Sequence, residues 1–160
     1  MLNIIEALQI IDMTKEYASE ISKWKYDGVY SIYNESEDGF DALTNGAHFA
    51  CVDATQGLIG YFCFGRDARI KTIEESVYDD SFIDIGLGLK PDLCGRSLGL
   101  IFLNEGLKYA SVLYNTNKFR LTVAAFNKRA IKVYQRAGFC AEREVTHLQT
   151  GSKFIIMKNE

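Results

Sequence analysis

The sequence predicts a mixed α/β fold, with a central twisted β-sheet flanked by helices, in a single domain over residues 1–160. Apolar runs at 82–89 and 120–126 are each followed by a helical pattern, and a strand–helix–strand order implies a crossover between parallel strands. Apolar runs at 47–53 and 58–64, separated by a polar turn, are typical of an antiparallel hairpin. The sheet is therefore expected to be mixed.

The first half of the chain predicts a strand and a helix before that hairpin. Residues 3–11 are rich in isoleucine and leucine and predict the strand. Asp12 and Thr14 suit the N-cap of a helix that runs to about Tyr26. Residues 26–40 are rich in tyrosine, glycine, asparagine and acidic side chains, so they predict a loop or a broken helix.

The second half has sharper signals, because proline, asparagine and glycine mark the ends of its elements. Pro91 ends a buried strand, Asn127 suits an N-cap, and Gly138 suits the end of a short helix. Residues 66–80 are polar without a clear period and are expected to form a loop or irregular strand. The expected elements are a strand at 82–89, a helix from about Gly95 to Tyr114, a strand at 120–126, a helix at 128–138 and a closing hairpin at 139–148 and 153–158.

Composition and charge narrow the class of protein. The chain has 160 residues, of which 48% are hydrophobic and 24% charged, as in globular proteins. The net charge of −3 gives no reason to expect nucleic acid, and no apolar run is long enough to span a membrane. The four cysteines and two histidines lack closely spaced pairs, so we expect no metal site and a reduced, cytoplasmic protein. Composition does not decide whether the chain forms a homodimer.

The turn Leu93–Gly99 leads from a buried strand into a helix. The first N–H groups of a helix have no partner within it and lie at the positive end of its dipole, so they suit a phosphate. Gly95, Ser97 and Gly99 are small enough for a pyrophosphate to approach the backbone, and Arg96 adds a positive charge. The alternative is an ordinary strand-to-helix turn in which Gly99 lets the helix pack on the sheet.

Downstream of this turn, the chain resembles the GNAT acetyltransferases. That family carries Q/R-x-x-G-x-G/A at the start of its central helix and, farther along, V-x-x-x-N-x-x-A-x-x-x-Y-x-x-x-G-F. The resemblance covers residues 82–139, roughly the second half of the chain. The residues that match are Leu89, Lys90, Pro91, Gly99, Val123, Asn127, Ala130, Tyr134, Gly138 and Phe139.

Two positions depart from the family pattern. Cys94 stands where the family has Gln or Arg, and Ser97 stands where it has the first glycine. Ser97 is small and its hydroxyl can donate to a phosphate, so we expect binding to survive. Cys94 removes a polar side chain, and cofactor affinity is the property that this change affects.

The resemblance implies a GNAT fold in which parallel strands 4 and 5 splay apart where the acetyl donor, acetyl-CoA, enters. Pantetheine would pair with the main chain of Leu87 and Leu89 as an added strand does, and a backbone N–H there would polarise the thioester carbonyl. Asn127 is expected to cap a helix and to contact pantetheine, whereas the basic residues after it suit either a solvated face or a phosphate. The other residues implied in cofactor binding are Cys94, Gly95, Arg96, Ser97, Leu98, Gly99, Arg129 and Lys132.

Two residues are candidates for the proton transfers. Tyr134 stands where many family members place a tyrosine near the sulfur, which implies a general acid for the departing thiolate; the alternative is a core aromatic residue. Asp84 lies within an apolar strand, where an acid is costly unless it is paired or lies in a cleft. It is the candidate for the base, and a structural aspartate bonded to a nearby cation is the equal alternative.

Aromatic side chains in the first half are candidates for acceptor binding. Aromatic rings and carboxylates suit a cationic amine, whereas core packing or solvation is the alternative for each residue alone. The sequence thus predicts an N-acetyltransferase that moves an acetyl group to a primary amine in a ternary complex, with a small-molecule amine preferred. The alternatives are a peptide or protein N-terminal or lysine acetyltransferase and a non-catalytic acetyl-CoA-binding module. The aromatic candidates are Trp24, Tyr26, Tyr30 and Tyr33, next to the acids Glu35, Glu37 and Asp38.

Overall fold

The computed structural model describes residues 7–34, 39–55 and 57–159. The chain divides into two compact units. We call the first the N-terminal unit, which comprises Met1–Phe62 and Leu87–Leu98, and the second the C-terminal unit, which comprises Cys63–Gly86 and Gly99–Glu160. The expectation of a single domain over the whole chain stays a prediction.

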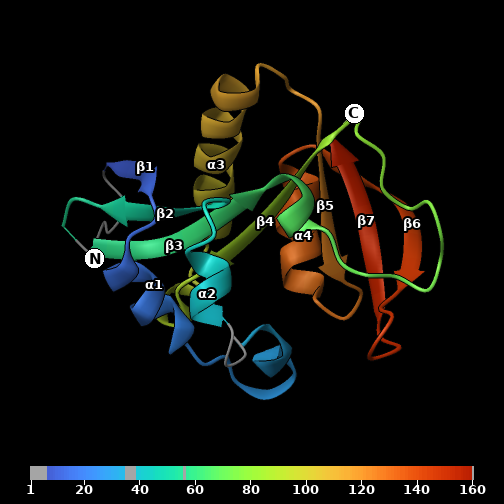
Figure 1. The fold of residues 1–160 in the computed structure, drawn as a ribbon, viewed down its shortest axis with the longest axis horizontal. Coiled ribbons are helices and arrows are strands. Elements are labelled where there is room, and N and C mark those ends of the chain that lie inside the picture. Colours follow the sequence, from blue (N-terminus) through green and yellow to red (C-terminus); the bar gives the residue numbers. More distant parts are fainter. Residues whose placement is uncertain (1–6, 35–38, 56, 160) are drawn as a thin grey trace. The chain divides into compact units, whose positions relative to one another are not determined.

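Among the described residues, seven strands form a mixed sheet in the order β1-β2-β3-β4-β5-β7-β6 (Figure 1). β1 pairs antiparallel with β2, and β7 pairs antiparallel with both β5 and β6, whereas β4 and β5 are parallel. The predicted mixed α/β fold is thereby confirmed. The strands are β1 (Leu8–Asp12), β2 (His48–Asp53), β3 (Gly57–Phe64), β4 (Ile83–Leu89), β5 (Phe119–Ala124), β6 (Phe139–Thr146) and β7 (Lys153–Asn159).

The first helix, α1 (Lys15–Ser22), begins at the predicted cap and ends before its predicted end. The hydroxyl of Thr14 accepts a hydrogen bond from the N–H of Tyr17 at 3.1 Å, which is the expected capping contact. The expectation that the helix reaches Tyr26 is wrong, because the N–H of Tyr26 donates to the side-chain oxygen of Asn34 (2.6 Å) and not to a helical carbonyl.

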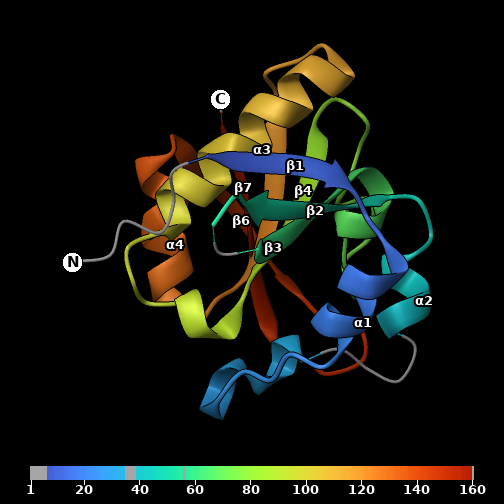
Figure 2. The same cartoon turned by 90° about the vertical axis from the view of Figure 1, so that its left-hand side faces the viewer.

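The segment expected at 26–40 as a loop or broken helix contains a 3-10 turn, η1 (Gly28–Tyr33), and the start of α2 (Gly39–Leu43). Asp12, the other candidate cap, is instead the last residue of β1. Of the strand expected at 3–11, residues 3–6 lie outside the described residues. In the N-terminal unit, α1 and α2 lie side by side (Figure 2). Its buried core consists of Ala18, Ile21, Trp24, Leu43, Ala50 and Leu58.

The C-terminal unit contains α3 (Gly99–Tyr114) and α4 (Lys128–Arg136). The expected start of α3 at about Gly95 is wrong. Gly95 and Ser97 have φ angles of 76° and 62°, and a right-handed helix excludes positive φ. None of the helices in the described part of the chain is both long and apolar enough to cross a membrane.

The strand β6 lies at one end of the strand order and carries a β-bulge. Its register with β7 shifts between Ala141 and Arg143, so Glu142 is the extra residue. Glu142 forms an ion pair with Lys158 of β7. The expected closing hairpin is confirmed by the antiparallel pairing of β6 with β7.

The polar segment between β3 and β4 is fastened to β6 by hydrogen bonds. After a short 3-10 turn, η2 (Gly65–Ala68), Thr72 forms an isolated bridge with His147. The carboxylate of Glu74 accepts hydrogen bonds from the N–H of Thr146 (2.8 Å) and from its hydroxyl (2.9 Å). Because Glu74 and Thr146 are 72 positions apart, no local pattern predicts this order.

Replacing Asn127 by alanine should lower the free energy of unfolding by about 1 kcal/mol. The side-chain oxygen of Asn127 accepts a hydrogen bond from the N–H of Ala130 at 3.1 Å and caps α4. Chemical denaturation followed by circular dichroism measures the change. Asn127→Asp is the matched control, because aspartate also caps helices. Equal losses in the two variants would contradict the capping role.

Candidate functional site

The turn before α3 exposes backbone with two left-handed residues. It follows a short 3-10 turn, η3 (Pro91–Leu93). Gly95 and Ser97 have φ angles of 76° and 62°, and both are exposed together with Arg96. Cys94 before them is extended (φ −67°, ψ 144°), and the two left-handed residues turn the backbone so that its main-chain N–H groups are available to an anion. The turn therefore has a backbone compatible with the predicted phosphate contact.

Ser97 occupies a backbone conformation that favours glycine, the residue that the family pattern has at this position. A left-handed φ costs an ordinary residue about 1–2 kcal/mol. Strained residues of this kind persist where the surrounding structure holds them, and they often cluster at binding sites. The serine therefore keeps the glycine-like shape of the turn and adds a hydroxyl.

The thiol of Cys94 faces the preceding strand end. Its sulfur lies 3.7 Å from the carbonyl oxygens of both Leu89 and Lys90. A thiol is a weak donor, so these contacts support the turn only modestly. The cofactor contacts of Cys94 and of the half-buried Leu98 stay predictions.

Gly99, the first residue of α3, lies against α4. A Cβ at this position would lie 3.3 Å from a methyl carbon of Val133, which is a tight contact. This geometry supports the alternative in which Gly99 serves packing, but against a helix and not against the sheet. A contact of Gly99 with the cofactor stays a prediction.

The main-chain N–H and C=O groups of β4 point alternately to its two sides. At its start the N–H of Ile83 donates to the carbonyl of Lys118, directly before β5 (3.0 Å). Just after its end the N–H of Lys90 donates to the carbonyl of Ile59 in β3 (2.8 Å). Because successive residues of a strand direct these groups to opposite sides, those of Leu87 and Leu89 point away from β3. They are the groups that the family resemblance assigns to pantetheine.

One of these groups is already bonded within the chain. The hydroxyl of Tyr26 donates to the carbonyl oxygen of Leu89 at 2.8 Å. A carbonyl oxygen has two lone pairs. A ligand that pairs with this part of β4 would therefore share the oxygen of Leu89 with Tyr26 and the weaker thiol contact of Cys94, or use the main chain of Leu87.

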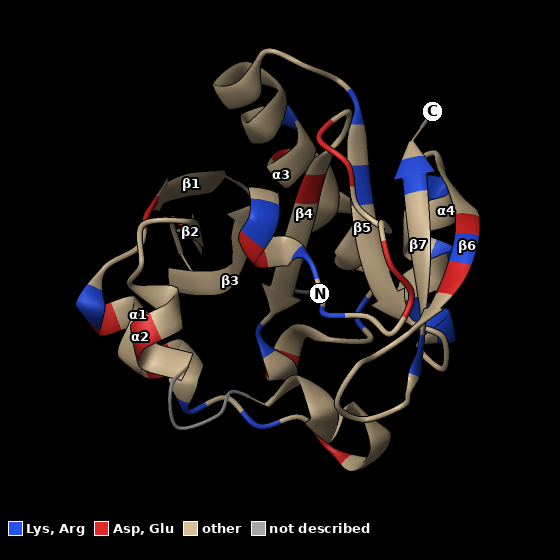
Figure 3. Ribbon diagram, turned by 45° about the vertical axis from the view of Figure 1, so that its right-hand side comes forward, with Lys and Arg blue, Asp and Glu red and all other residues tan. Residues whose placement is uncertain are grey.

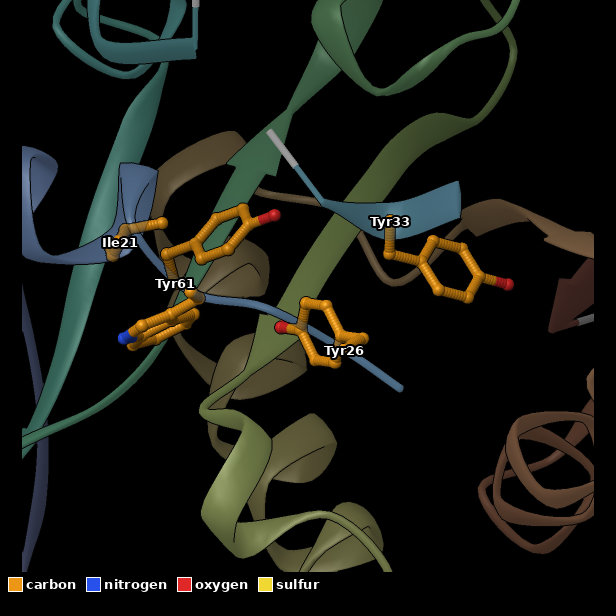
Figure 4. A pocket seen from close by; sticks show the side chains of 5 residues that line it. Ile21, Tyr26, Tyr33 and Tyr61 are labelled. Carbon is orange, nitrogen blue, oxygen red and sulfur yellow. The ribbon is translucent and has the colours of Figure 1, made fainter. Parts of the chain in front are cut away.

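Aromatic side chains line a pocket in the N-terminal unit (Figure 4). Three of the four predicted aromatic residues are among the lining residues, and the fourth, the half-buried Tyr30, is not. The ring centroids of Tyr26 and Tyr33 are 6.4 Å apart in an edge-to-face arrangement. The acids expected beside them, at 35, 37 and 38, lie outside the described residues. The lining residues are Ile21, Trp24, Tyr26, Tyr33 and Tyr61.

Tyr61 of β3 is a lining residue that sequence reasoning missed. Its ring centroid lies 6.1 Å from that of Trp24 and 6.3 Å from that of His48. The ring also covers Gly88 of β4, where a Cβ would come within 2.3 Å of Tyr61 Cε1. The alternating glycines of β4 are the sequence signal that could have pointed to it, because a strand glycine often marks a close approach.

The predicted acid, Tyr134, lies on α4 in the C-terminal unit. It is half-buried, and its ring meets that of Phe139 edge-on at a centroid distance of 6.4 Å. Arg129 and Lys132 of the same helix are exposed, which fits a solvated face as well as a phosphate contact. The roles of these residues and the cofactor contact of Asn127 stay predictions.

Asp84, the candidate base, belongs to a buried ion-pair network in the C-terminal unit. The side chains of Asp84 and Arg120 are each 1% exposed. The two carboxylate oxygens of Asp84 accept hydrogen bonds from Nε (2.7 Å) and Nη2 (2.8 Å) of Arg120, and Oδ2 also accepts from Nε of Arg69 (2.8 Å). Figure 3 shows the acidic position of β4 next to a basic position of β5.

This geometry favours the structural alternative for Asp84. Two guanidinium groups donate to both oxygens of this carboxylate at 2.7–2.8 Å and occupy the atoms that a base would use to take a proton from the amine. Hydrogen bonds to Asp84 raise the pKa of Arg120. At the rim of the network, hydrogen bonds from Ser81 lower the pKa of Asp79 to about 2, so Asp79 remains charged at neutral pH. The base role of Asp84 stays a prediction.

Tyr78 packs against the two arginines of this network and is hydrogen-bonded to β5. The guanidinium carbons of Arg69 and Arg120 lie 5.4 Å and 5.1 Å from its ring centroid. Its hydroxyl forms a hydrogen bond of 2.7 Å with the hydroxyl of Thr122 in β5. The described residues contain no group of three or more acidic, histidine or cysteine side chains placed to hold a metal ion.

A family model described as "Acetyltransferase (GNAT) family" matches residues 10–139 of the chain. The match extends the resemblance into the first half of the sequence, from β1 to the start of β6. Among curated proteins, none matches the chain.

Several solved structures are similar to the chain in fold. An acetyltransferase (GNAT family) from Bacillus anthracis has a TM-score of 0.72 at 14% identity, and the match covers 96% of this chain and 95% of that chain. A chimera of the spermidine N-acetyltransferase SpeG from Vibrio cholerae and hSSAT has a TM-score of 0.70 at 19% identity, covering 94% and 93%. The spermidine/spermine N-acetyltransferase SpeG from Vibrio cholerae, solved with manganese ions, has a TM-score of 0.66 at 18% identity, covering 94% and 91%.

Replacing Asp84 by asparagine should lower the free energy of unfolding by about 3–5 kcal/mol, because it leaves the buried guanidinium of Arg120 with only the exposed carboxylate of Asp79, at 3.4 Å, as a counter-charge. Chemical denaturation measures the loss. The matched control is Asp80→Asn. Asp80 pairs with Arg69 from a side chain that is 74% exposed, so its removal should cost less than about 1 kcal/mol. A variant at Asp84 with unchanged stability and lost turnover would instead identify Asp84 as the base.

Proposed function

Because the chain belongs to the acetyltransferase (GNAT) family, we propose that it moves the acetyl group of acetyl-CoA to a primary amine of a small molecule. The amine attacks the thioester directly while both substrates are bound. Acetyl-CoA supplies an acyl group activated by its thiol leaving group, and no metal takes part.

The exposed turn around Gly95 and Ser97 is the observation that carries this proposal. Its left-handed residues and the charge of Arg96 suit the pyrophosphate of the donor. The main chain at the end of β4, directed away from β3, suits the pantetheine arm. The residues that we propose for donor binding are Leu87, Leu89, Cys94, Gly95, Arg96, Ser97, Leu98, Gly99, Asn127, Arg129 and Lys132.

The reaction requires two proton transfers by the protein. The lone pair of the neutral amine forms the new C–N bond, the C–S bond breaks, and Tyr134 gives its phenolic proton to the departing sulfur. The proton of the attacking amine passes to a base. Asp84 is the candidate from the sequence, and its two guanidinium partners argue against it, so the experiment on Asp84→Asn bears directly on this role.

The aromatic pocket supports a cationic amine as the acceptor. Trp24, Tyr26 and Tyr33 line this pocket, and aromatic rings of this kind attract an ammonium group and pack against an alkyl chain. Two of the structural neighbours from Vibrio cholerae are named spermidine or spermidine/spermine N-acetyltransferases. Spermidine is therefore the first amine to test, followed by amines with one charge and an apolar or aromatic body.

Calorimetric titration should show saturable binding of acetyl-CoA and no binding of adenosine. Ser97→Asp should bind acetyl-CoA at least about tenfold more weakly than Ser97→Asn, because only the aspartate repels the pyrophosphate. The two variants form a matched pair, since both side chains tolerate a left-handed backbone. Equal affinities would contradict the phosphate contact, and no binding to the unaltered protein at millimolar acetyl-CoA would overturn the proposed function.

Replacing Tyr134 by phenylalanine should lower kcat about a hundredfold while the dissociation constant of acetyl-CoA stays unchanged, because only the proton donor is lost. Release of free thiol in the presence of spermidine and a panel of primary amines measures turnover. Tyr109→Phe is the control, because the Tyr109 ring stacks on Phe64 and lies on another helix, α3. Nearly normal turnover with intact binding would make Tyr134 a packing residue.

A further inference from the structure

Tyr26 belongs both to the pocket wall and to the end of β4. Its ring lines the aromatic pocket, and its hydroxyl donates to the carbonyl oxygen of Leu89 at 2.8 Å. Its N–H donates to the side-chain oxygen of Asn34 at 2.6 Å, which closes the segment that carries Tyr33. In Figure 4 the hydroxyl of Tyr26 points toward the side on which Tyr61 lies. A single side chain therefore joins two functional surfaces of the N-terminal unit.

Two further contacts fasten the pocket to the same strand end. The ring of Tyr61 lies on Gly88 so closely that a Cβ there would be 2.3 Å from it. Lys90, directly after β4, pairs at 4.0 Å with Glu20 of α1, which precedes the lining residue Ile21. Two side chains that line the pocket, Tyr61 and Tyr26, therefore contact adjacent residues of β4, Gly88 and Leu89.

The contact of Tyr26 differs from the other two, because its hydroxyl is hydrogen-bonded to a carbonyl oxygen with which a donor bound along β4 would pair. The carbonyl of Leu89 points away from β3, to the side proposed for pantetheine. An amide N–H of the donor at this oxygen shares or displaces the Tyr26 hydroxyl. The hydroxyl and the ring are one rigid plane, so a change at the oxygen moves the ring that lines the pocket.

We propose that Tyr26 is a positioning residue that couples the acceptor pocket to the donor strand through the carbonyl of Leu89. The inference rests on the proposed function, because it takes acetyl-CoA as the ligand of β4. Binding of the donor reshapes the aromatic pocket before the amine enters. By linkage, an amine in the pocket changes the affinity for the donor by the same factor.

The single tryptophan of the chain, Trp24, lines this pocket and reports on it without any label. The unaltered protein is titrated with acetyl-CoA, and binding is followed in parallel by calorimetry and by Trp24 emission, with excitation at wavelengths that adenine does not absorb. We expect an emission change that saturates with the calorimetric dissociation constant. In Tyr26→Phe, which keeps the ring, we expect the dissociation constant to stay within about threefold and the emission change to fall below half.

Tyr33→Phe is the matched control, because it removes the hydroxyl of another tyrosine that lines the pocket and leaves the contact with Leu89 in place. It should keep the full emission change, and thermal unfolding should show that both variants are folded. Heat of binding without an emission change in the unaltered protein, or a full emission change in Tyr26→Phe, overturns the inference and leaves the proposed function standing. Absence of binding heat in the unaltered protein overturns the proposed function, and the inference with it.

Discussion

The buried ion pair between Asp84 and Arg120 is the constraint on which β4 depends. The two residues occupy paired positions of the parallel strands β4 and β5, and their side chains are each 1% exposed. Removing two charges from water is costly, and only close bidentate geometry offsets that cost. Arg69 adds a second cation from the segment before β4. A shifted register would leave these charges buried without partners, so the pair fixes how β4 is aligned with β5.

In the later part of β4, two glycines leave room for side chains from neighbouring elements. A Cβ on Gly86 would lie 2.6 Å from the sulfur of Cys63, and one on Gly88 would lie 2.3 Å from the ring of Tyr61. Neighbouring side chains therefore cover this face of the strand, and main-chain groups are what these positions have to offer. The donor contacts proposed here instead involve the main chain of the alternate residues Leu87 and Leu89, which points away from β3.

Much of the fold could be predicted from the sequence, because the signals are local. Alternating strand and helix patterns gave the mixed sheet, and Thr14 and Asn127 cap helices through contacts three residues away. Ser97 misled the prediction of where α3 begins, since serine rarely adopts a positive φ. For the site, sequence patterns indicated residue types but not partners. Tyr26 and Leu89 are 63 residues apart, and only the fold brings them together.

The β-bulge of β6 bears on self-association. β6 ends the strand order, and an edge strand offers unpaired N–H and C=O groups to another chain. Glu142 interrupts the regular spacing, and the exposed run from Cys140 to Glu144 carries two carboxylates and one guanidinium. A second copy docking edge to edge along β6 would meet an irregular ladder and charged side chains that must lose water. The bulge therefore works against extension of the sheet through β6.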